Sequence, residues 1–258
     1  MVFSMNEFND ELHTLTLSDD GSYTAYSAEY DEHYHSTKDG ALHESLVKHV
    51  IPALELKKYQ DEINILDICF GLGFNTLATL HYVKQQNIKS KINIYSPELD
   101  AKLIESLADF TYPEEFEDYK DLIASLVKDG SYKDESIFIE LFVGDARFYI
   151  KELQNDFFDI VYQDAFSPSS NPILWTKEYF ADIAALMKED AILTTYSTAF
   201  KTRLALYENN FNIYINTGEN FRNATLASKG KLESYKEVDI LHKISCNKDV
   251  ESLRDAKL

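Results

Sequence analysis

The chain has 258 residues, and its 25 Lys and Arg against 44 Asp and Glu leave a net charge of −19 at pH 7. A hydrophobic content of 45% and a charged content of 27% are ordinary for a globular protein and exclude wholesale disorder, while only two cysteines exclude a disulfide scaffold. So acidic a chain argues against a broad surface for nucleic acids or anionic membranes, because such surfaces need many cations, and leaves room only for a local basic patch.

The N-terminal segment 1–45 is predicted to form a small β-rich extension. Residues 1–10 are polar and acidic without a signal-peptide pattern, and no later apolar run is long enough to cross a bilayer, so we expect a cytoplasmic protein without a membrane segment. Short strands rich in β-branched or aromatic residues are expected at 15–17, 23–27 and 30–34. The apolar spacing of the next segment, 41–56, is helical.

From residue 63 the pattern alternates between strands and helices. Short apolar runs predict strands at 63–70, 91–98, 136–143, 157–163 and 191–197. Helices are predicted to follow these strands at 74–85, 101–108, 146–153, 176–187 and 200–209. Strands separated by helices of this length indicate a Rossmann-like, doubly wound α/β fold with a mostly parallel sheet.

This Rossmann-like domain is expected to span residues 46–245. Its last strands are expected at 211–217, 225–228 and 238–243, and residues 246–258 are expected to form a frayed tail. The interval 111–135 interrupts the strand–helix rhythm and is strongly acidic. We interpret it as a helical insertion with a solvated face.

The segment 67–73 (DICFGLG) joins the first strand of this alternation to its helix. Glycine at such a junction lets the backbone approach a ligand, and the following helix presents free N–H groups, although a tight turn without a ligand explains the same pattern. Glu98 ends the next strand, where a doubly wound fold places a carboxylate against ribose hydroxyls. Pro97 and Asp100 also mark an exposed helix start there. Together the two elements favour a nucleotide-type site.

Two further acids follow strand ends. Asp145 can accept a hydrogen bond from an adenine amino group or cap the next helix, and the two roles are compatible. Asp164 precedes a loop that contains Phe166, Pro168 and Pro172. A structural turn with an N-cap explains the prolines, but not an aromatic residue at a strand terminus. We therefore expect Asp164 at the floor of the crevice outside the carboxyl ends of the strands.

His33 and His35 raise the question of a metal site. No cysteine partners them, and a strand would point both histidines one way without a defined third ligand, so no metal is expected. A turn that orders the N-terminal segment over the crevice is the favoured interpretation. Cys69 is interpreted as a small buried residue and not as a nucleophile.

Several of these strings together resemble a known family. The best matches are 31–40 (DEHYHSTKDG), 70–75 (FGLGFN), 144–145 (GD) and 164–176 (DAFSPSSNPILWT), in this order along the chain. The family is that of the bacterial tRNA methyltransferases that convert 5-aminomethyl-(2-thio)uridine at the wobble position to its 5-methylaminomethyl form. The chain resembles the methyltransferase half of the bifunctional MnmC enzyme and its stand-alone relatives over residues 26–228.

The resemblance implies a class I fold that binds S-adenosylmethionine (AdoMet), without a metal. By analogy, glycines 71 and 73 approach the methionine moiety, Glu98 binds the ribose, Asp145 reaches the adenine, and Asp164 faces the acceptor amine as an orienter or base. The full cofactor-binding set expected from the resemblance is Phe70, Gly71, Gly73, Asn75, Glu98, Asp145, Ala146 and Asp164. Substrate contacts are expected from Phe166, Ser167, Pro168, Trp175, Lys201, Arg203 and Arg222.

Two features depart from the family pattern. Cys69 stands where the family usually has a glycine, which puts close backbone approach at that position in question. The flavin-dependent oxidase domain that is fused on in the bifunctional enzyme has no counterpart in these 258 residues. We therefore expect other, upstream enzymes to supply the aminomethyl substrate.

The charge distribution bears on a tRNA partner. Residues 98–135 hold twelve acids and four bases, a net charge of −8, whereas residues 199–231 hold five bases and two acids, a net charge of +3. The hypothesis is that the later segment forms a small positive rim beside the crevice; scattered surface charges are the alternative. Few phosphate contacts predict weak, strongly salt-dependent tRNA binding.

Two other functions stay open from the sequence. The first is a methyl- or aminopropyl-transferase that acts on a small amine or a polyamine, since polyamine synthases share a strand-rich N-terminus and an acidic protein attracts polycations. The second is a non-catalytic AdoMet-binding or RNA-scaffold protein, which the expected position of Asp164 disfavours.

Overall fold

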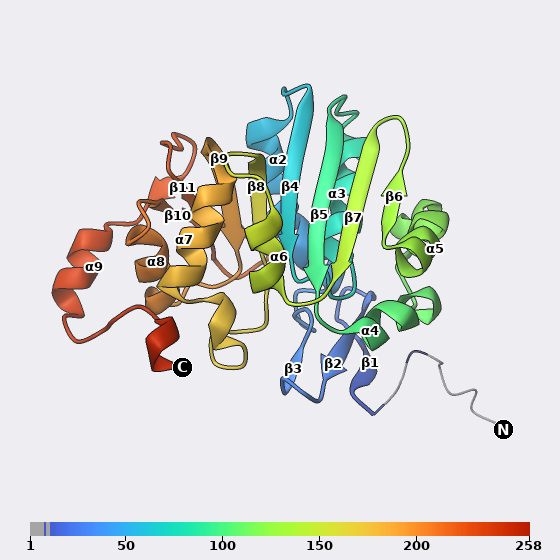
Figure 1. Ribbon diagram of the computed structural model, residues 1–258, viewed down its shortest axis with the longest axis horizontal. Helices are drawn as coiled ribbons and strands as arrows, with labels where there is room; N and C mark the ends of the chain where they lie inside the picture. Colours follow the sequence, from blue (N-terminus) through green and yellow to red (C-terminus); the bar gives the residue numbers. More distant parts are fainter. Residues whose placement is uncertain (1–7, 9–10) are drawn as a thin grey trace.

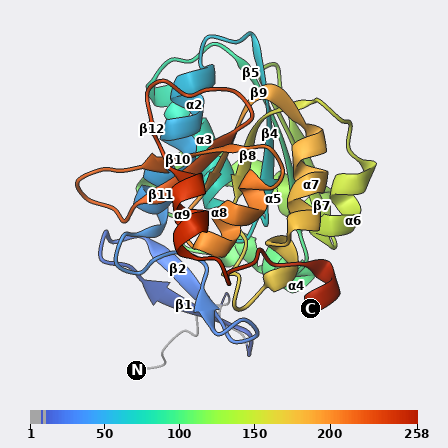
Figure 2. The same cartoon turned by 90° about the vertical axis from the view of Figure 1, so that its left-hand side faces the viewer.

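The computed structural model describes residue 8 and residues 11–258. Apart from Phe8, the predictions made for segment 1–10 therefore lie outside the described residues. The described strands form a three-stranded sheet, β1-β2-β3, and a nine-stranded sheet in the order β12-β10-β11-β9-β8-β4-β5-β7-β6. Figures 1 and 2 both show the smaller sheet set below the larger one.

The strands of the small sheet are β1 (His13–Leu17), β2 (Tyr23–Ser27) and β3 (Glu32–His33). Those of the large sheet are β4 (Glu62–Ile68), β5 (Lys91–Glu98), β6 (Ser131–Lys133), β7 (Ile137–Val143), β8 (Phe158–Gln163), β9 (Met187–Thr195), β10 (Asn212–Asn216), β11 (Ala224–Ser228) and β12 (Lys236–Glu237). The α-helices are α1 (Ala41–Glu44), α2 (Ile51–Lys57), α3 (Phe74–Gln85), α4 (Ala101–Ser106), α5 (Lys120–Asp129), α6 (Ala146–Glu152), α7 (Lys177–Leu186), α8 (Phe200–Tyr207) and α9 (Ile240–Cys246). A π-helical segment, Ser45–Val50, joins α1 to α2.

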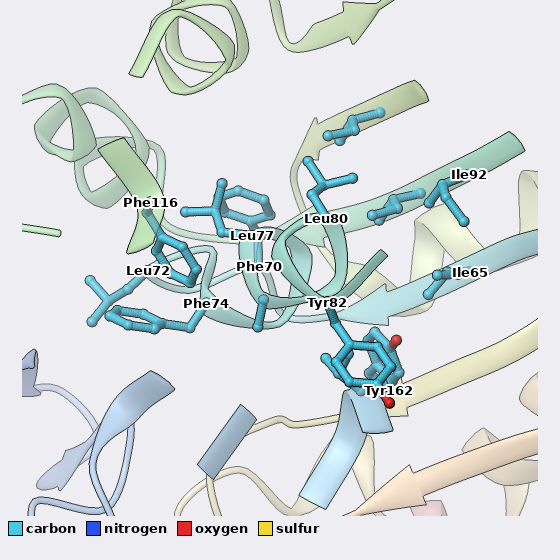
Figure 3. Packing of buried hydrophobic residues seen from close by; sticks show 14 of the residues in the cluster. Ile65, Phe70, Leu72, Phe74, Leu77, Leu80, Tyr82, Ile92, Phe116 and Tyr162 are labelled. Atoms are coloured by element: carbon cyan, nitrogen blue, oxygen red, sulfur yellow. The ribbon is translucent and has the colours of Figure 1, made fainter. Parts of the chain in front are cut away.

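The centre of the large sheet is parallel. β4 pairs in parallel with β5 on one side and with β8 on the other. β5 in turn pairs in parallel with β7, and β8 with β9, whereas the remaining pairs of this sheet are antiparallel. Every residue of β4 after Glu62 is buried, because helices cover both faces of the sheet. Ile65 packs into the core beneath α3, whereas Leu66 packs into the core beneath α6 and α7 (Figure 3 shows the first of these cores). The predicted doubly wound α/β fold is confirmed.

The acidic insertion is mostly helical, as predicted. It contains a short 3₁₀ segment, Glu114–Tyr119, and the amphipathic helix α5, which buries Leu122, Ile123 and Leu126 and leaves its acids toward solvent. The insertion also contributes β6, an edge strand antiparallel to β7, which the sequence analysis missed. The domain boundaries at residues 45 and 245 stay a prediction.

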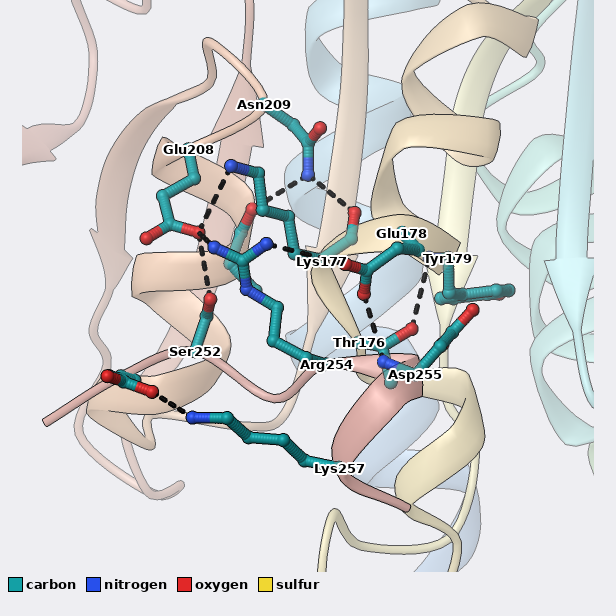
Figure 4. Close-up of polar contacts among 12 residues, drawn as sticks. Thr176, Lys177, Glu178, Tyr179, Glu208, Asn209, Ser252, Arg254, Asp255 and Lys257 are labelled. Atoms are coloured by element: carbon teal, nitrogen blue, oxygen red, sulfur yellow. Dashed lines mark hydrogen bonds and ion pairs between the residues drawn. The ribbon is translucent and has the colours of Figure 1, made fainter.

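Two predictions for the C-terminal region are wrong. Residues 238–243 do not form a strand: α9 begins at Ile240, because the side chain of Asp239 caps it by accepting a hydrogen bond from the His242 N–H (2.9 Å). The segment 246–258 is not frayed either. Arg254 approaches acids on α7 and beyond α8 (Figure 4). Asp255 pairs with Arg147 at 2.6 Å, so charge contacts hold this end against the domain. Among the described residues, no helix has the length and apolar character needed to cross a membrane.

Candidate active site

A cavity of about 1130 Å³ lies at the edge of the large sheet where the parallel strands end. Its walls come from the residues that follow β4, β5, β7, β8 and β9, as a doubly wound sheet requires of a ligand site. Residues of the segment 27–39 of the N-terminal extension, which includes β3, close one side. Figure 1 shows this extension below the ends of β4 and β5, so the expected ordering of the N-terminal segment over the crevice is confirmed.

The bend after β4 depends on left-handed backbone conformations. Gly71 has φ +54° and Gly73 has φ +78°, and a Cβ on Gly73 would lie 2.8 Å from the ring of Phe70. Gly71 and Phe70 line the cavity, whereas Gly73 turns the chain into α3 beneath the Phe70 ring and is not among the lining residues. Gly73 therefore shapes the bend, which corrects its expected role as a direct contact.

Cys69 also adopts a left-handed conformation, with φ +67°. A residue with a Cβ is strained there by about 1–3 kcal/mol, which gives a physical reason for the glycine that the family usually has at this position. Burial raises the pKa of the Cys69 thiol well above its usual value, with the surrounding carboxylates adding to the effect. The thiol therefore stays protonated at neutral pH, in agreement with its interpretation as a buried residue and not a nucleophile.

Glu98 is buried at the end of β5 and faces the cavity. Its Oε2 accepts a hydrogen bond from the Gly71 N–H (2.8 Å) and its Oε1 accepts one from the Asp100 N–H (2.9 Å). Burial raises the pKa of Glu98, and these two N–H donors oppose that rise. The alternative role as an exposed acid at a helix start is wrong, because Asp100 caps α4 instead. Glu98 thus fixes the glycine bend and presents a carboxylate to the cavity.

Asp145 combines the two roles considered for it. Its side chain accepts a hydrogen bond from the Arg147 N–H (2.7 Å) as the N-cap of α6, and it also lines the cavity together with Ala146. One carboxylate oxygen can therefore serve the helix while the other is available to a ligand.

Asp164 lies at the floor of the cavity, with 12% of its side chain exposed. Its Oδ2 accepts a hydrogen bond from Asn75 Nδ2 (2.8 Å), and its Oδ1 lies 3.3 Å from Nε2 of His49. Burial alone would raise the pKa of Asp164, but the nearby His49, with further help from His35 and Asn75, outweighs it and holds the pKa below its usual value. The Asp164 side chain is therefore a carboxylate, although it is mostly buried.

The loop after β8 builds an aromatic wall. Phe166 stacks on Tyr30 with ring centroids 4.5 Å apart and meets Tyr34 at 4.9 Å. Ser167 and Pro168 also line the cavity. Trp175, in contrast, is fully buried and does not line it; its Nε1–H donates to the Phe166 carbonyl (2.8 Å). The expected substrate contact of Trp175 is wrong, and its observed role is to hold the loop from behind.

The three cations expected to contact substrate are placed very differently. Arg222 is exposed and lines the cavity mouth. Lys201 is exposed on α8 but outside the lining residues, so its substrate role stays a prediction. Arg203 is buried and donates from Nε to the hydroxyl of Thr225 (3.0 Å), which corrects its expected contact with substrate. Burial lowers the pKa of this guanidinium.

Several residues of the site were missed from the sequence. They are Tyr30, Glu32, Tyr34, Lys48, His49 and Tyr196, of which all but His49 line the cavity. Their only sequence signal was position: the first three lie inside the motif at 31–40 or directly beside it. No sequence pattern marked His49 as a functional residue, because the apolar spacing of its helix predicts only that this position is buried.

The histidines of the N-terminal motif diverge. His33 is exposed and packs on Tyr26, whereas His35 is buried against Phe74. Across the part of the chain that the structure describes, no group of three or more His, Cys, Asp or Glu residues is arranged to hold a metal ion.

Comparison with known proteins decides the family. A sequence model described as "S-adenosyl-L-methionine-dependent methyltransferase" matches residues 114–230. The crystal structure of MnmC2 from Aquifex aeolicus superimposes with a TM-score of 0.82 at 30% identity, covering 96% of this chain and 81% of that one. The chain belongs to the MnmC methyltransferase-half family. The resemblance seen in the sequence is thereby confirmed, and with it an AdoMet-dependent enzyme.

Two curated proteins are also similar to this chain. The bifunctional MnmC protein of Azoarcus sp., named for tRNA 5-methylaminomethyl-2-thiouridine biosynthesis, is 30% identical over 78% of this chain and 33% of its own length. An uncharacterized protein of Methanocaldococcus jannaschii, MJ0670, is 35% identical over 78% of this chain and 55% of its own length. The chain thus spans about half or less of the length of these two curated relatives.

The residues of the cavity fit AdoMet. Gly71 lines the cavity and has no side chain to cover its backbone, and a Cβ there would crowd the Tyr34 ring at 3.1 Å; Glu98 and Asp145 present carboxylate oxygens at two strand ends. In a class I fold these groups suit the methionine, ribose and adenine parts of the cofactor, respectively. Asn75 and Ala146 also line the cavity, and Asn75 is hydrogen-bonded to Asp164.

Proposed function

We propose that this member of the MnmC methyltransferase-half family transfers a methyl group from AdoMet to the 5-aminomethyl group of wobble (2-thio)uridine in tRNA. The observation that carries the proposal is the charged, mostly enclosed Asp164, which shares one cavity with the glycine bend and an aromatic wall. The similarity to the bifunctional MnmC protein, which is named for the biosynthesis of 5-methylaminomethyl-2-thiouridine in tRNA, supports the same reaction.

The aromatic wall suits a nucleobase. The rings of Tyr30 and Tyr34 both lie within 5 Å of the Phe166 ring, centroid to centroid, and single-stranded RNA bases are commonly recognised by stacking on such side chains. Because Phe166 lies two residues after Asp164, a base held against this wall would place its 5-substituent beside the carboxylate. The cavity is large enough to hold a cofactor and a nucleoside together.

Asp164 and the aromatic wall have opposite effects on the protonation of the acceptor amine. An alkylammonium that titrates near 10.4, as Lys does, leaves only ~10⁻³ of the neutral form at pH 7.4, which costs roughly 4 kcal/mol. The apolar wall disfavours the ammonium by desolvation, whereas the Asp164 carboxylate attracts it and orients its N–H bonds. When bound, AdoMet supplies a methyl group on a sulfonium, and Asp164 and Asn75 align the amine for an in-line displacement.

The mouth of the cavity provides contacts for a polyanion. Lys38 and Arg222 are exposed lining residues, and Lys201 lies on α8 close to the lining segment 196–199. We infer that tRNA docks across these cations, that the reaction takes place in the cytoplasm, and that upstream enzymes supply the aminomethyl group. So few phosphate contacts imply weak binding that falls steeply with salt.

Incubation of the protein with methyl-labelled AdoMet and undermodified bulk tRNA, followed by nucleoside analysis, tests the proposal. The expected product is labelled 5-methylaminomethyl-(2-thio)uridine. A parallel incubation with polyamines separates the alternative acceptor class, and label in polyamines but not in tRNA would replace the proposed substrate. Binding of AdoMet with no transfer to either acceptor would leave the non-catalytic alternative.

A further inference from the structure

A π-helical segment sits directly beside the candidate active site. Ser45–Val50 interrupts the helix that runs from α1 into α2, and it turns the adjacent residues Lys48 and His49 both into the protein. In a regular α-helix, neighbouring side chains point about 100° apart, and the wider turn here changes the directions of Lys48 and His49 relative to such a helix. Wide turns of this kind recur at functional sites in proteins. Lys48 lines the cavity and pairs with Asp39 (2.9 Å) and Glu44 (2.6 Å).

His49 lies behind Asp164, away from the cavity. Its side chain is fully buried, its Nδ1 lies 2.9 Å from the Thr194 hydroxyl on β9, and its Nε2 lies 3.3 Å from Asp164 Oδ1. Nε2 makes no hydrogen bond of good geometry, although the carboxylate is within reach of a small shift of the ring. The imidazole therefore connects the carboxylate at the cavity floor to a hydroxyl inside the sheet.

A purely structural role explains this arrangement poorly. A buried nitrogen without a good hydrogen bond costs on the order of 1–3 kcal/mol, and an apolar side chain of similar size would fill the same space without that cost. The other ionisable groups that face His49 are Asp67 on β4 and His35, and the ring of Tyr162 packs against it with centroids 5.9 Å apart. Two acids, Asp164 and Asp67, therefore lie close to the ring of His49.

We propose that His49 is a positioning residue that draws the proton of the acceptor ammonium away through Asp164, so that the amine is neutral when it is methylated. This inference rests on the proposed reaction of an amine with AdoMet. The ammonium gives one proton to the Asp164–His49 pair, and the amine nitrogen then forms its bond to the methyl carbon as the carbon–sulfur bond breaks and its electron pair stays on sulfur. The product leaves as a secondary ammonium, and the pair releases its proton to water.

The pH dependence of methyl transfer in single turnovers tests this role. The variant His49→Gln is compared with the wild type between pH 6 and pH 9.5, with undermodified tRNA as acceptor and AdoMet affinity measured by calorimetry. We expect a rate lower by on the order of 100-fold at pH 7 that converges toward the wild-type rate as pH rises, because free amine then forms without help. AdoMet affinity is expected to change less than 2-fold. An equal loss of rate at every pH would show a structural role and overturn the inference.

Two further variants keep the test decisive. Thr194→Val removes the hydroxyl beside Nδ1 without changing side-chain size, so we expect it to fold and to show the same pH-dependent loss in weaker form; a wild-type profile would contradict the inference. His43→Gln on α1, outside the cavity lining, is the matched control and is expected to behave as the wild type. If the wild type labels polyamines instead of tRNA, the proposed function fails, and the same pH comparison with the polyamine as acceptor still decides the role of His49.

Discussion

The carboxylate of Glu32 on β3 accepts hydrogen bonds from both the backbone N–H (3.0 Å) and the hydroxyl of Ser167, which follows β8. The same carboxylate accepts a third hydrogen bond from the Ser170 hydroxyl (2.7 Å). One side chain of the small N-terminal sheet thus fixes the loop that carries Phe166 and follows Asp164. The acceptor side of the cavity is held in place from outside the large sheet.

Glu32→Gln is expected to loosen this loop, because an amide lacks the charge that strengthens the three hydrogen bonds. Hydrogen bonds to charged groups contribute about 1.5–3 kcal/mol, so kcat/KM for tRNA should fall by roughly 10-fold or more. Steady-state kinetics measures the loss, and limited proteolysis should show faster cleavage in 166–171. Glu11→Gln, an exposed acid before β1, is the matched control. A Glu32 variant with the kinetics of the control would contradict the role of this contact.

Asp164→Asn is expected to lower turnover at least ~30-fold while AdoMet still binds, because the amide keeps the shape of the side chain but loses the charge that orients the amine. Single-turnover rates and calorimetry measure the two effects separately. Asp121→Asn, on the exposed face of the acidic insertion, should match the wild type. Near-normal turnover of the Asp164 variant would remove this residue from the mechanism.

Glu98→Ala should weaken AdoMet binding by about 1–3 kcal/mol, because it removes a carboxylate acceptor and also frees the Gly71 N–H that shapes the bend. Isothermal titration calorimetry with AdoMet provides the measurement. Glu105→Ala, an exposed acid on α4, tests whether any charge change in this region has the same effect. An unchanged affinity of the Glu98 variant would show that the ribose is held elsewhere.

Arg222→Ala and Arg203→Ala should have separable effects, since one side chain is exposed at the mouth and the other is buried. Loss of one phosphate contact at Arg222 should raise KM for tRNA and reduce the slope of log K against log salt by about 0.7–0.9, with an unchanged melting temperature. Arg203→Ala should instead lower the melting temperature, because it removes a buried hydrogen bond to Thr225. Equal salt slopes for the wild type and the Arg222 variant would exclude Arg222 from the tRNA contact.

Asp67→Asn should change how stability depends on pH. Burial, with a smaller contribution from nearby Asp164, raises the pKa of Asp67 to about 7, although a hydrogen bond from Thr76 opposes the rise. Between pH 4 and pH 7 the folded state therefore keeps a proton on Asp67 that the unfolded state has released. The free energy of unfolding of the wild type consequently falls as pH rises from 4 to 7. The amide has no such loss, so its stability relative to wild type should grow over this range by on the order of 4 kcal/mol.

Denaturant unfolding at pH 4, 5.5, 7 and 8 measures that difference. Asp159→Asn is the contrasting variant, because this buried acid pairs with Lys188 at 2.8 Å and its loss should destabilise the protein at neutral pH. A constant difference between the Asp67 variant and the wild type at all four pH values would show that Asp67 is ionised throughout.

Much of the fold could be predicted from local patterns, and the failures have physical causes. The helix Phe74–Gln85 has the bounds expected, because glycines mark the bend before it. The strand Lys91–Glu98 also has the bounds expected, because it lies in a sheet that is covered on both faces and is therefore a mostly apolar run. The expected strand at 238–243 is a helix because the cap residue Asp239 outweighs short apolar alternation. Edge strand β6 spans three residues, too few for a periodicity to show.

In the site, residues at strand ends could be predicted because strand polarity alone places them. Gly71, Glu98, Asp145 and Asp164 all line the cavity as expected. Side-chain direction could not be predicted at the same stage. Lys201 and Arg203 are two residues apart on α8 and therefore lie about 200° apart around the helix, so that one is exposed while the other is buried.

The wide turn at Ser45–Val50 makes the number of residues in this helix matter as well as their identity. Removing one residue from the turn would let an ordinary α-helix form with little loss of helical content, and the flanking turns would keep their orientation, because a wide turn takes up one extra residue. The side chains inside the segment, Lys48 and His49 among them, would change direction. Relatives of this chain with one residue fewer here would need to find a different partner for the acid at the end of β8, so helix length offers a simple marker for sorting them.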